Sequence, residues 1–392
     1  MIPREITSHL KEKWLTYPIV CVLGPRQCGK TTLAKSAFPQ LPYFDLERPS
    51  HAAPFIADPE SRLENLGKGI ILDEAQQIPA LFPVLRSIVD EERDHNGQYL
   101  LLGSASPILI KTISESLAGR VAFVEMSPLT FREINHKSSD YRSLWTFGGF
   151  PEQWLMKETK QKWEWKENFV QTYIQRDLNV LDIQINSSQM RKMWGMLAHL
   201  NGSFWNASQI AGSLGASQTL VNRYLNILED TYLITMLPSF FANIKKRFIK
   251  SPKIYFKDTG LLHYFLQIQN FEQLDISPYK GASFESFVIQ QIRQYLLLNC
   301  PGFELYHWRS SNGAEVDLII KINGKIIPIE IKLSKNPDIQ MTRGLKSFMQ
   351  DMDLENGFVI YPGNESYSLK NGIYAYPLID FLTNPTHLAP AN

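Results

Sequence analysis

The chain has 392 residues, which is more than one typical hydrophobic core supports, so we expect two or three domains. A formal net charge of +1 excludes a global electrostatic field that would attract nucleic acid or anionic membranes, and leaves only local patches for such binding. The scattered Cys21, Cys28 and Cys300 exclude a disulfide framework and a CxxC metal site, and the absence of a signal-peptide core or a membrane-length apolar stretch predicts a cytoplasmic protein with no membrane partner.

Short apolar runs recur along the first part of the chain, with helix-length segments between them. Residues 1–16 predict an amphipathic helix whose apolar face holds Ile6, Leu10, Trp14 and Leu15. Solid apolar runs are typical of buried parallel strands. They cover residues 18–23, 43–45, 70–72, 98–102 and 121–124, and a helix is expected near 83–92. The pattern predicts a parallel α/β domain.

A glycine-containing loop follows the first predicted strand and precedes a predicted helix. Residues 24–31 fit the pattern GxxxxGK[ST] at every required position. Glycines let the main chain curl so that amide groups point at phosphate oxygens, and the following helix adds the partial positive charge of its N-terminus. We expect Lys30 to reach the β- and γ-phosphates of ATP and the Thr31 hydroxyl to bind Mg²⁺. The predicted nucleotide contacts are Gly24, Pro25, Arg26, Gln27, Cys28, Gly29, Lys30, Thr31 and Thr32.

Acidic and polar residues end two further predicted strands. Asp73 and Glu74 follow the run 70–72, and we expect Asp73 to hold Mg²⁺ through water and Glu74 to act as general base on the attacking water. Taken alone, such an acidic pair also suits the cap of a helix. Ser104 ends another strand and is a candidate sensor of the γ-phosphate, with capping of the next segment as the equal alternative.

Hydrolysis also needs positive charge on the transferred phosphoryl group, and an arginine in that role accelerates the reaction by about 10³–10⁵. The candidates are Arg120, in Ser116-Leu-Ala-Gly-Arg120, and Arg176, in Tyr173-Ile-Gln-Arg176-Asp177. Either residue would act from its own chain or from a neighbouring subunit. Each also fits an ordinary surface or ion-paired arginine.

These segments resemble a known family. The GPRQCGKTT loop, the ILDEAQQIP strand end, the LLGSAS strand and the SLAGR and SPLTFRE segments are similar to AAA-type ATPases of bacteria and archaea that carry a C-terminal domain of poorly defined function. Segments beginning at Gly148, Lys253 and Trp308 are similar to that family too, so the resemblance covers nearly the whole chain. It implies an AAA-like ATPase core, a winged-helix region and a nuclease-like fold, with nucleotide sites between the subunits of a ring such as a hexamer.

Residues 206–228 have the spacing of two short helices joined by a turn. Ser208 is expected to cap the first helix, Gly215 to form the turn and Ser217 to cap the second helix. The second helix would present four side chains to DNA phosphates or base edges, and a basic stretch that ends at Lys253 follows where a wing would lie. The DNA-binding candidates are Gln218, Thr219, Asn222, Arg223, Lys245, Lys246, Arg247 and Lys250. The alternative interpretation is a protein–protein module with a solvated basic surface.

Acidic residues in the last third form a pattern typical of metal-dependent nucleases. Glu285 lies near the start of a predicted helix, Asp317 lies in the predicted strand 315–322, and Glu330 and Lys332 lie on one face of the next strand. Two acids and a lysine on one face can hold a divalent ion and activate water. This is the D…ExK pattern of the PD-(D/E)XK nucleases and archaeal junction resolvases, which implies Glu285, Asp317 and Glu330 as ligands of a second Mg²⁺ or Mn²⁺.

Three alternatives remain for that pattern: charges on a solvent-facing strand, a Glu330–Lys332 ion pair, or a fold retained for binding without cleavage. A hairpin at Asn323-Gly324 is expected to join the two strands, and His307, Arg309 and Lys335 are nearby candidates for phosphate contact.

We therefore expect an α/β chain with three domains. These are an AAA-like P-loop ATPase domain at 1–135, a helical and winged-helix region at 136–278, and a restriction-endonuclease-like α/β domain at 279–392, with a linker at 278–281. The predicted function is ATP hydrolysis coupled to DNA processing, with branched, Holliday-junction-like DNA as partner. The alternative is a nucleotide-dependent regulatory or defence switch that acts through a protein partner.

Overall fold

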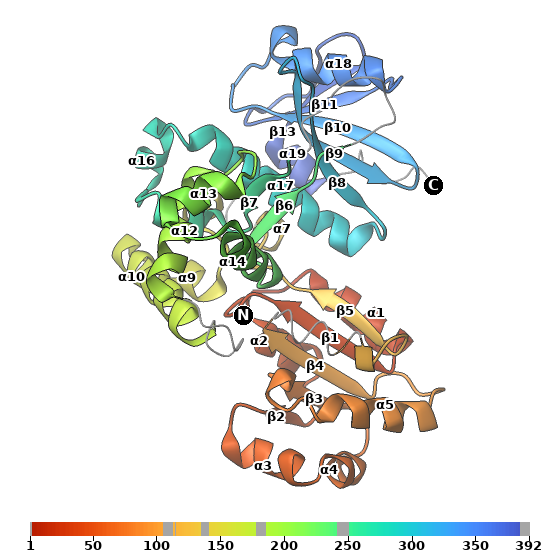
Figure 1. The fold of residues 1–392 in the computed structure, drawn as a ribbon. Helices are drawn as coiled ribbons and strands as arrows, with labels where there is room; N and C mark the ends of the chain where they lie inside the picture. The colour runs from red at the N-terminus through yellow and green to blue at the C-terminus, as the bar shows by residue number, and fades with distance from the viewer. Residues whose placement is uncertain are drawn as a thin grey trace. The chain divides into compact units, whose positions relative to one another are not determined.

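The computed structural model describes residues 2–104, 113, 115–134, 141–177, 186–240 and 251–384 (Figure 1). The chain divides into two compact units. Unit 1 consists of Met1–Leu129, Phe150–Leu155 and Asn226–Tyr232, and unit 2 consists of Thr130–Gly149, Met156–Leu225 and Leu233–Asn392. The division into three domains with the boundaries given above stays a prediction. In the described ranges, no helix combines the length and the apolar character that crossing a bilayer requires.

Unit 1 contains the parallel sheet that the apolar runs predicted. Its strands are β1 (Ile19–Gly24), β2 (Tyr43–Asp45), β3 (Ile70–Asp73), β4 (Tyr99–Ser104) and β5 (Val121–Glu125). The sheet order is β2-β3-β4-β1-β5, and every neighbouring pair is parallel. Because the strands are parallel, their carboxyl ends all lie along the same side of the sheet. The loop that follows β1 and the residue Asp73, which ends β3, are therefore both on that side.

Among the described residues, unit 1 contains the helices α1 (Ile6–Thr16), α2 (Lys30–Ala37), α3 (Pro49–Ala57), α4 (Pro59–Leu66), α5 (Leu81–Glu91) and α9 (Pro151–Leu155), with a 3₁₀ turn at Ala75–Gln77. The expected helix at the N-terminus is confirmed, and Ile6 and Leu10 are buried. Leu15, however, is 76% exposed, so the prediction that it belongs to the packed face was wrong. Trp14 packs its ring against Phe38, with the ring centres 4.9 Å apart.

The first part of unit 2 is mainly helical. It contains α7 (Phe131–Ile134), α8 (Tyr141–Phe147), α10 (Thr159–Thr172), a π-helical turn (Tyr173–Asp177), α12 (Ser187–His199), α13 (Ala207–Leu214), α15 (Thr259–Phe265) and α16 (Phe271–Ile276). Helix α14 (Gln218–Asp230) begins in unit 2, and β6 (Ile234–Leu237) pairs with β7 (Lys253–Phe256) in a two-stranded antiparallel sheet. Residues 241–250, which carry most of the predicted basic stretch, lie outside the described residues.

Helices α13 and α14 have the predicted helix–turn–helix order, with one difference in the caps. Gly215 forms the turn in the left-handed region (φ 61°), and the Ser217 hydroxyl accepts a hydrogen bond from Leu220 N at 3.2 Å. The cap of α13 is not Ser208 but Asn206, whose side-chain oxygen accepts from Ser208 N and Gln209 N. Asn206 is the better cap here because its carbonyl reaches two amides of the first turn at once.

The second part of unit 2 is a six-stranded mixed sheet with the order β12-β13-β11-β10-β9-β8. Its strands are β8 (Glu304–Arg309), β9 (Glu315–Ile322), β10 (Lys325–Ile331), β11 (Gly357–Tyr361), β12 (Tyr367–Ser368) and β13 (Ile373–Pro377). The accompanying helices are α17 (Lys280–Asn299), α18 (Arg343–Asp351) and α19 (Leu378–Thr383), with a 3₁₀ turn at Ile339–Thr342. The expected linker at 278–281 lies inside unit 2 and overlaps the start of α17, so it does not divide the two units.

The predicted hairpin between β9 and β10 is confirmed. Asn323 (φ 48°) and Gly324 (φ 78°) form its turn, and positive φ at both positions is the geometry that this residue pair favours. The strands are antiparallel with Leu318 opposite Ile329, so Asp317 and Glu330 occupy adjacent positions. The hairpin therefore brings together the two acids that the sequence pattern singled out.

Candidate functional site

Residues 24–31 form a curled loop between β1 and α2. Gln27 (φ 59°) and Gly29 (φ 101°) both have left-handed backbone conformations. A Cβ atom at Gly24 would lie 2.2 Å from the main-chain oxygen of Met126, so only glycine fits there. Lys30 is buried, and its Nζ donates hydrogen bonds to the carbonyl oxygens of Gly24 (3.1 Å) and Pro25 (3.0 Å). The lysine ammonium is therefore held by the main chain at the start of the loop.

Thr31 and Asp73 lie in direct contact at the carboxyl edge of the sheet. The Thr31 hydroxyl donates to Asp73 Oδ2 at 2.6 Å, and the Tyr43 hydroxyl donates to the same oxygen at 2.8 Å. Burial, followed by the hydrogen bond to Asp73, raises the pKa of Tyr43, which therefore stays a hydroxyl donor. Sequence reasoning missed Tyr43; its place in β2, the strand beside β3, was the available signal. Hydroxyl and carboxylate oxygens are ligands that suit Mg²⁺.

Glu74 follows Asp73 in a left-handed conformation (φ 54°), which is uncommon for a glutamate. Its carboxylate accepts a hydrogen bond from the Gln76 amide, and its main-chain N–H donates to Asp73 Oδ1 at 3.0 Å. Gln76 is a second residue that the sequence pattern did not single out.

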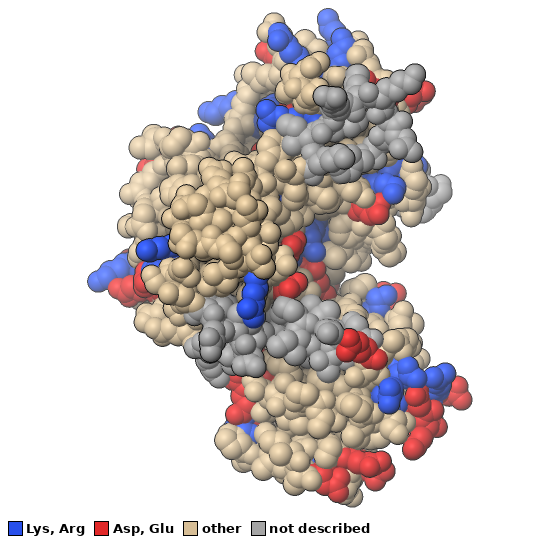
Figure 2. Space-filling view, viewed as in Figure 1, with Lys and Arg blue, Asp and Glu red and all other residues tan. Residues whose placement is uncertain are grey.

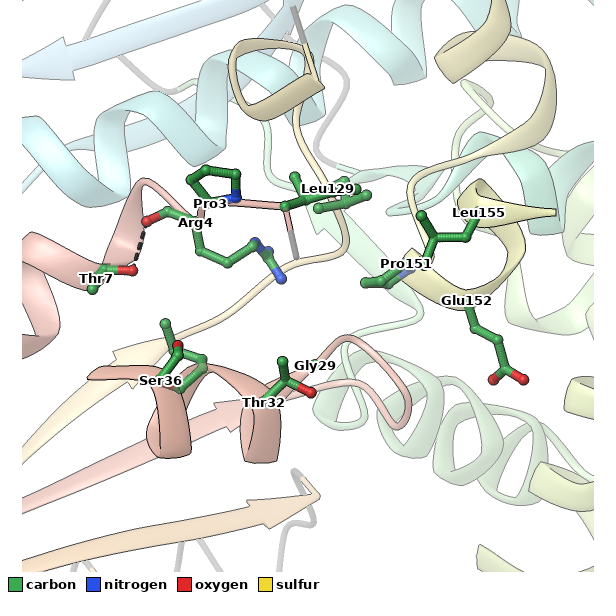
Figure 3. Close-up of a pocket in the computed structure, with 12 residues that line it drawn as sticks. Pro3, Arg4, Thr7, Gly29, Thr32, Ser36, Leu129, Pro151, Glu152 and Leu155 are labelled. Atoms are coloured by element: carbon green, nitrogen blue, oxygen red, sulfur yellow. Dashed lines mark hydrogen bonds between the residues drawn. The ribbon is translucent and has the colours of Figure 1, made fainter. Parts of the chain in front are cut away.

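A cavity of about 540 Å³ opens in unit 1 beside the loop and the first turn of α2 (Figure 3). Arg4, Leu129, Pro151 and Leu155 project toward it from several segments of the unit. Its full lining consists of Ile2, Pro3, Arg4, Thr7, Gly29, Thr32, Leu33, Ser36, Leu129, Pro151, Glu152 and Leu155. A mostly apolar hollow of this size with a few polar groups is typical of a small-molecule site.

Arg4 connects the cavity to the loop. Its guanidinium donates to the carbonyl oxygen of Cys28 at 2.9 Å and to that of Ser127 at 2.6 Å. Arg4 thus ties the outer side of the loop to the segment that follows β5. No sequence motif marked this residue, because its partners lie far along the chain.

Arg120, one of the two candidate arginines, lies far from the loop. Arg120 O accepts a hydrogen bond from Ile19 N at the start of β1, and the loop begins at the other end of that strand, roughly 16 Å away at the usual rise of a strand. Its guanidinium is held by Asp90, with Nε and Nη2 each 2.7 Å from a carboxylate oxygen, which lowers the pKa of Asp90 to about 2. This position does not support action of Arg120 on a phosphate at the loop of the same chain.

Two other predicted residues are placed only through the main chain. Arg176 belongs to the π-helical turn, and its side chain lies outside the described part of the structure. Ser104 ends β4 directly beside Gly24 in the sheet register, which is the end of the sheet where the loop begins. Its side chain is likewise not described, so a sensor role stays a prediction.

Helix α14 presents the expected polar residues to solvent. Gln218, Thr219, Asn222 and Arg223 are exposed, whereas Val221, Tyr224 and Leu225 on the other side are buried. Asn222 accepts a hydrogen bond from the indole of Trp205 at 3.2 Å. On the face drawn in Figure 2, acidic and basic side chains form small groups of both signs, as the net charge of +1 leads one to expect.

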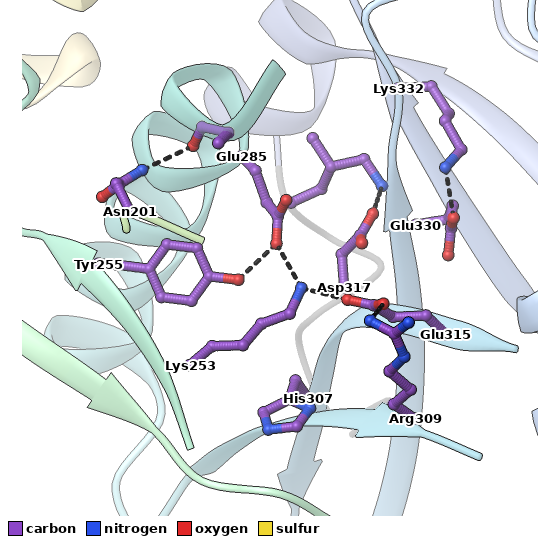
Figure 4. A network of polar contacts seen from close by, with 12 residues as sticks. Asn201, Lys253, Tyr255, Glu285, His307, Arg309, Glu315, Asp317, Glu330 and Lys332 are labelled. Carbon is purple, nitrogen blue, oxygen red and sulfur yellow. Dashed lines mark hydrogen bonds and ion pairs between the residues drawn. The ribbon is translucent and has the colours of Figure 1, made fainter. Parts of the chain in front are cut away.

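Four acidic residues of unit 2 lie in one network of polar contacts (Figure 4). Glu285 comes from α17, Glu315 and Asp317 from β9, and Glu330 from β10. Burial raises the pKa of Glu285 to about 7 against the opposing effect of Lys253. Burial, followed by the charge of Asp317, raises the pKa of Glu330 well above its usual range. Asp317 accepts a hydrogen bond from Ile331 N at 2.8 Å, and Lys332 pairs with Glu330 at 2.5 Å.

Lys253 and Tyr255 of β7 complete the network, and sequence reasoning missed both. Lys253 is buried, and its ammonium pairs with Glu285 at 3.1 Å and with Glu315. The place of Lys253 at the end of the basic stretch had indicated a solvated basic wing. Because its side chain is buried and ion-paired, Lys253 is not part of such a surface. The Tyr255 hydroxyl donates to Glu285.

The three expected metal ligands of unit 2 are not arranged as a metal site. In the part of the chain that the structure describes, no three Asp, Glu, His or Cys side chains are grouped so that they can hold a metal ion. Glu285, Asp317 and Glu330 each have a hydrogen-bond partner from the chain, although Glu330 Oε2 is buried without one. The three carboxylates are neighbours but do not fit a three-ligand metal site.

The nearby candidates for phosphate contact are also placed. His307 is fully buried and bonds to the Ser251 carbonyl oxygen at 3.1 Å, so it is not available at the surface. Arg309 pairs with Glu315 at 3.1 Å. Lys335 is exposed.

Comparisons with known proteins agree with the site in unit 1. Residues 16–135 match the AAA domain family, and residues 138–272 and 280–381 match two domains of unknown function, DUF8612 and DUF4143. The loop, its strand and the family match together define an AAA-type P-loop ATPase domain.

Two curated relatives define the family of the whole chain. The uncharacterized proteins Rv2008c of Mycobacterium tuberculosis and Mb2031c of Mycobacterium bovis are each 39% identical to it over 382 residues, which covers 97% of this chain and 84% of each relative. The chain belongs to the family of these proteins. An uncharacterized protein of Methanocaldococcus jannaschii is 24% identical over 312 residues, or 74% of this chain and 67% of that protein.

Among solved structures, a Walker-type ATPase of Pyrococcus abyssi has a TM-score of 0.47 and 17% identity, covering 68% of this chain and 96% of that chain. A TM-score this low adds nothing to the assignment of the fold.

Proposed function

We propose that the chain binds ATP with Mg²⁺ at residues 24–31 and hydrolyses it. The observation that carries this proposal is the contact of Thr31 with Asp73 at 2.6 Å beside a curled loop whose Lys30 ammonium is held by main-chain carbonyls. The main-chain amides of the loop and the N-terminus of α2 would bind the phosphates, and Lys30 would stabilise their negative charge. Thr31 and Asp73 supply the oxygens that suit Mg²⁺, which offsets phosphate charge when it is bound.

The cavity beside the loop supports the same proposal. It adjoins Gly29 and Thr32, so the nucleoside of a bound nucleotide would extend into it from the phosphates. Its apolar walls suit a purine ring, and Arg4, Thr7 and Glu152 are the polar groups that can contact it.

Glu74 is the residue we assign as general base. Its main-chain N–H donates to Asp73, which ties this residue to the end of β3, and the Gln76 amide donates to its carboxylate. Positive charge for the transferred phosphoryl group would come from Arg176 or from an arginine of a neighbouring subunit, Arg120 included. This requirement is the reason to propose a homo-oligomer, of which a hexameric ring is one form.

We further propose that ATP hydrolysis is coupled to DNA. The exposed polar face of α14, with Arg223 in its first half, follows a turn in the manner of a recognition helix. A winged helix made of α12–α14 and β6–β7 is consistent with this proposal. The D…ExK pattern in the β9–β10 hairpin points to branched, Holliday-junction-like DNA as the substrate, with the C-terminal region gripping it.

One experiment separates these proposals from the alternative of a switch with a protein partner. ATP turnover is measured without DNA and with single-stranded, duplex and four-way-junction DNA, for the wild type, Lys30→Ala and Arg223→Glu. We expect Lys30→Ala to lose turnover under all conditions and Arg223→Glu to lose only the stimulation by DNA. No affinity of folded wild type for nucleotides would end the ATPase proposal, and turnover indifferent to every DNA would favour the protein-partner switch.

Salt dependence gives a second test of DNA binding. Each phosphate neutralised by the protein contributes about −0.9 to the slope of log affinity against log salt. Arg223→Glu should therefore flatten that slope by about one phosphate or more. A wild-type affinity that does not change with salt would contradict a phosphate-contacting helix.

A further inference from the structure

Lys253 occupies the centre of the acidic network of unit 2. It is the first residue of β7, and only 4% of its side chain is exposed. Figure 4 shows the side chain extending from its strand toward Glu285 of α17 and Glu315 of β9, with the ammonium between them. The ammonium lies 3.1 Å from Glu285 Oε1 and also contacts Glu315 Oε1.

The surrounding groups are arranged around this cation. Tyr255, two residues further along β7, donates its hydroxyl to the same Glu285 oxygen that Lys253 contacts. Arg309 contacts the second oxygen of Glu315 at 3.1 Å. The side chain of Glu285 is 16% exposed and that of Glu315 is 25% exposed. Buried carboxylates are costly to ionise without a cation nearby, and here the chain supplies one.

The remaining acids face the same network from the hairpin. Asp317 lies close enough to Lys253 and Lys332 for both cations to favour its ionised form, although burial opposes ionisation. Glu330 is paired with Lys332. The network therefore combines four carboxylates with the three cations Lys253, Lys332 and Arg309, which together nearly balance the charge.

We propose that the Lys253 ammonium, paired with Glu285 and Glu315 and near Asp317, takes the place of a divalent metal ion, so that the C-terminal region holds no catalytic metal while Lys253 is in place. A divalent ion at this point would have to displace a buried ammonium from its carboxylates or tolerate a like charge at short range in a poorly solvated site. An acidic cluster without such a lysine imposes neither of these two costs on a bound ion. The proposal goes beyond the ATPase proposal and does not depend on it.

A functional consequence follows for DNA. Without a metal to activate water, the D…ExK residues would not cut a phosphodiester bond, and the region would serve DNA only by binding. The lysine comes from the strand that follows the basic stretch, so the residues of the predicted wing and the acidic cluster are connected through β7.

The test measures the binding of Mn²⁺ alone to the full chain without nucleotide, from the electron paramagnetic resonance signal of free Mn²⁺. Wild type, Lys253→Ala and Lys253→Met are each compared with the same chain carrying Asp317→Asn, so that only ions bound at the acidic cluster are counted. No three of the described acids are grouped to hold a metal while Lys253 is in place, so we expect no Asp317-dependent ion in the wild type. In both Lys253 variants the carboxylates are released from the ammonium and can approach one another, and we expect one ion per chain. Lys321→Ala, which removes the exposed ion pair between Lys321 of β9 and Glu304 of β8, is the matched control and should gain no ion.

Two results would overturn the proposal. One is an Asp317-dependent Mn²⁺ in the wild type, and the other is no gain of an ion in either folded Lys253 variant. Circular dichroism checks that each variant is folded. If one Lys253 variant is not folded, Mn²⁺ binding by the wild type and by the other variant still tests the proposal. Incubation of supercoiled plasmid with wild type and Mn²⁺ is a second readout, in which Asp317-dependent nicking would contradict the proposal.

Discussion

Lys30 of unit 1 and Lys253 of unit 2 are both buried, but they have different partners. In unit 1, Lys30 donates to the neutral carbonyls of Gly24 and Pro25. In unit 2, Lys253 is paired with the carboxylates of Glu285 and Glu315. Neutral carbonyls leave the charge of an ammonium available to an anionic ligand, whereas carboxylates neutralise it within the fold. The first arrangement is suited to binding phosphate and the second to stabilising the protein.

The carboxylates differ in the same way. The hydrogen bonds that the structure describes for the Asp73 side chain come from neutral groups, namely the hydroxyls of Thr31 and Tyr43 and the main-chain amide of Glu74. Glu330 and Glu285 are each held by a lysine. Residue types alone therefore do not distinguish a metal-binding acid from an ion-paired one; the partners do.

The largest effect should come from Lys253→Met. Because Glu285 and Glu315 would lose their buried cation, we expect the free energy of unfolding of unit 2 to fall by about 3–5 kcal/mol. Urea unfolding followed by tryptophan fluorescence measures this, since Trp145, Trp194 and Trp308 are buried in unit 2. Lys321→Met, which removes the exposed ion pair with Glu304, should leave the urea midpoint unchanged. A midpoint for Lys253→Met equal to that of the wild type would break the comparison.

Lys30→Met should have the opposite profile. We expect ATP turnover to fall about 10²–10³-fold, because a positioned charge on the phosphates is lost. The unfolding midpoint should barely change, since the described hydrogen bonds of Lys30 go to neutral carbonyls. Lys11→Met, on the exposed side of α1, is the control for turnover. Turnover that survives in Lys30→Met would contradict the role assigned to the loop.

Acid should destabilise unit 2 through His263. Burial lowers the pKa of His263 to about 3, and its ring bonds to Thr146 O at 2.8 Å and to Ser283 Oγ at 2.6 Å. The unfolded chain takes up this proton near pH 6.5, so the stabilisation is complete above that pH and is lost as the pH falls toward 3. Between pH 6.5 and 5 the loss should be about 2 kcal/mol. The raised pKa of Glu285 and of Glu330 acts in the opposite direction on acidification, so the effect of His263 is the difference between wild type and His263→Phe. Urea unfolding at both pH values should show the wild type losing about 2 kcal/mol more than His263→Phe.

The smallest effect should come from Arg4→Ala. Without the bonds to Cys28 and Ser127 the loop would be less well held, and we expect KM for ATP to rise about 2- to 10-fold with little change in kcat. Arg4→Lys should restore part of the affinity, since a lysine can replace one of the two bonds. A loss confined to kcat would show instead that Arg4 acts on the chemical step.

Much of unit 1 could be predicted from the sequence. The strands that became β1 to β5, the loop and Asp73 were all recognised because short apolar runs, a glycine motif and a strand end are local signals. The β9–β10 hairpin was recognised for the same reason: Asn323 and Gly324 specify its turn, and the turn sets the register that places Asp317 beside Glu330. The cap of α13 was misassigned by two residues because Asn206 and Ser208 have equal local claims.

The contacts that decide the character of each site were not predictable in this way. Arg4 and Cys28 are 24 residues apart, Tyr43 and Asp73 are 30 apart, and Lys253 and Glu285 are 32 apart, with no motif that relates the members of a pair. Lys253 was grouped with a basic surface because its neighbours in sequence are basic. It is buried because the apolar residues that follow it in β7 pack into the core of unit 2.

The sequence by itself determined a phosphate-binding loop on a parallel sheet and a pair of acids on a hairpin, since local backbone geometry and periodicity specify both. Only the tertiary structure decided which charges are available to a ligand. Whether a buried lysine faces a carbonyl or a carboxylate depends on chain segments that meet only after folding, because electrostatic pairing acts across space and not along the sequence.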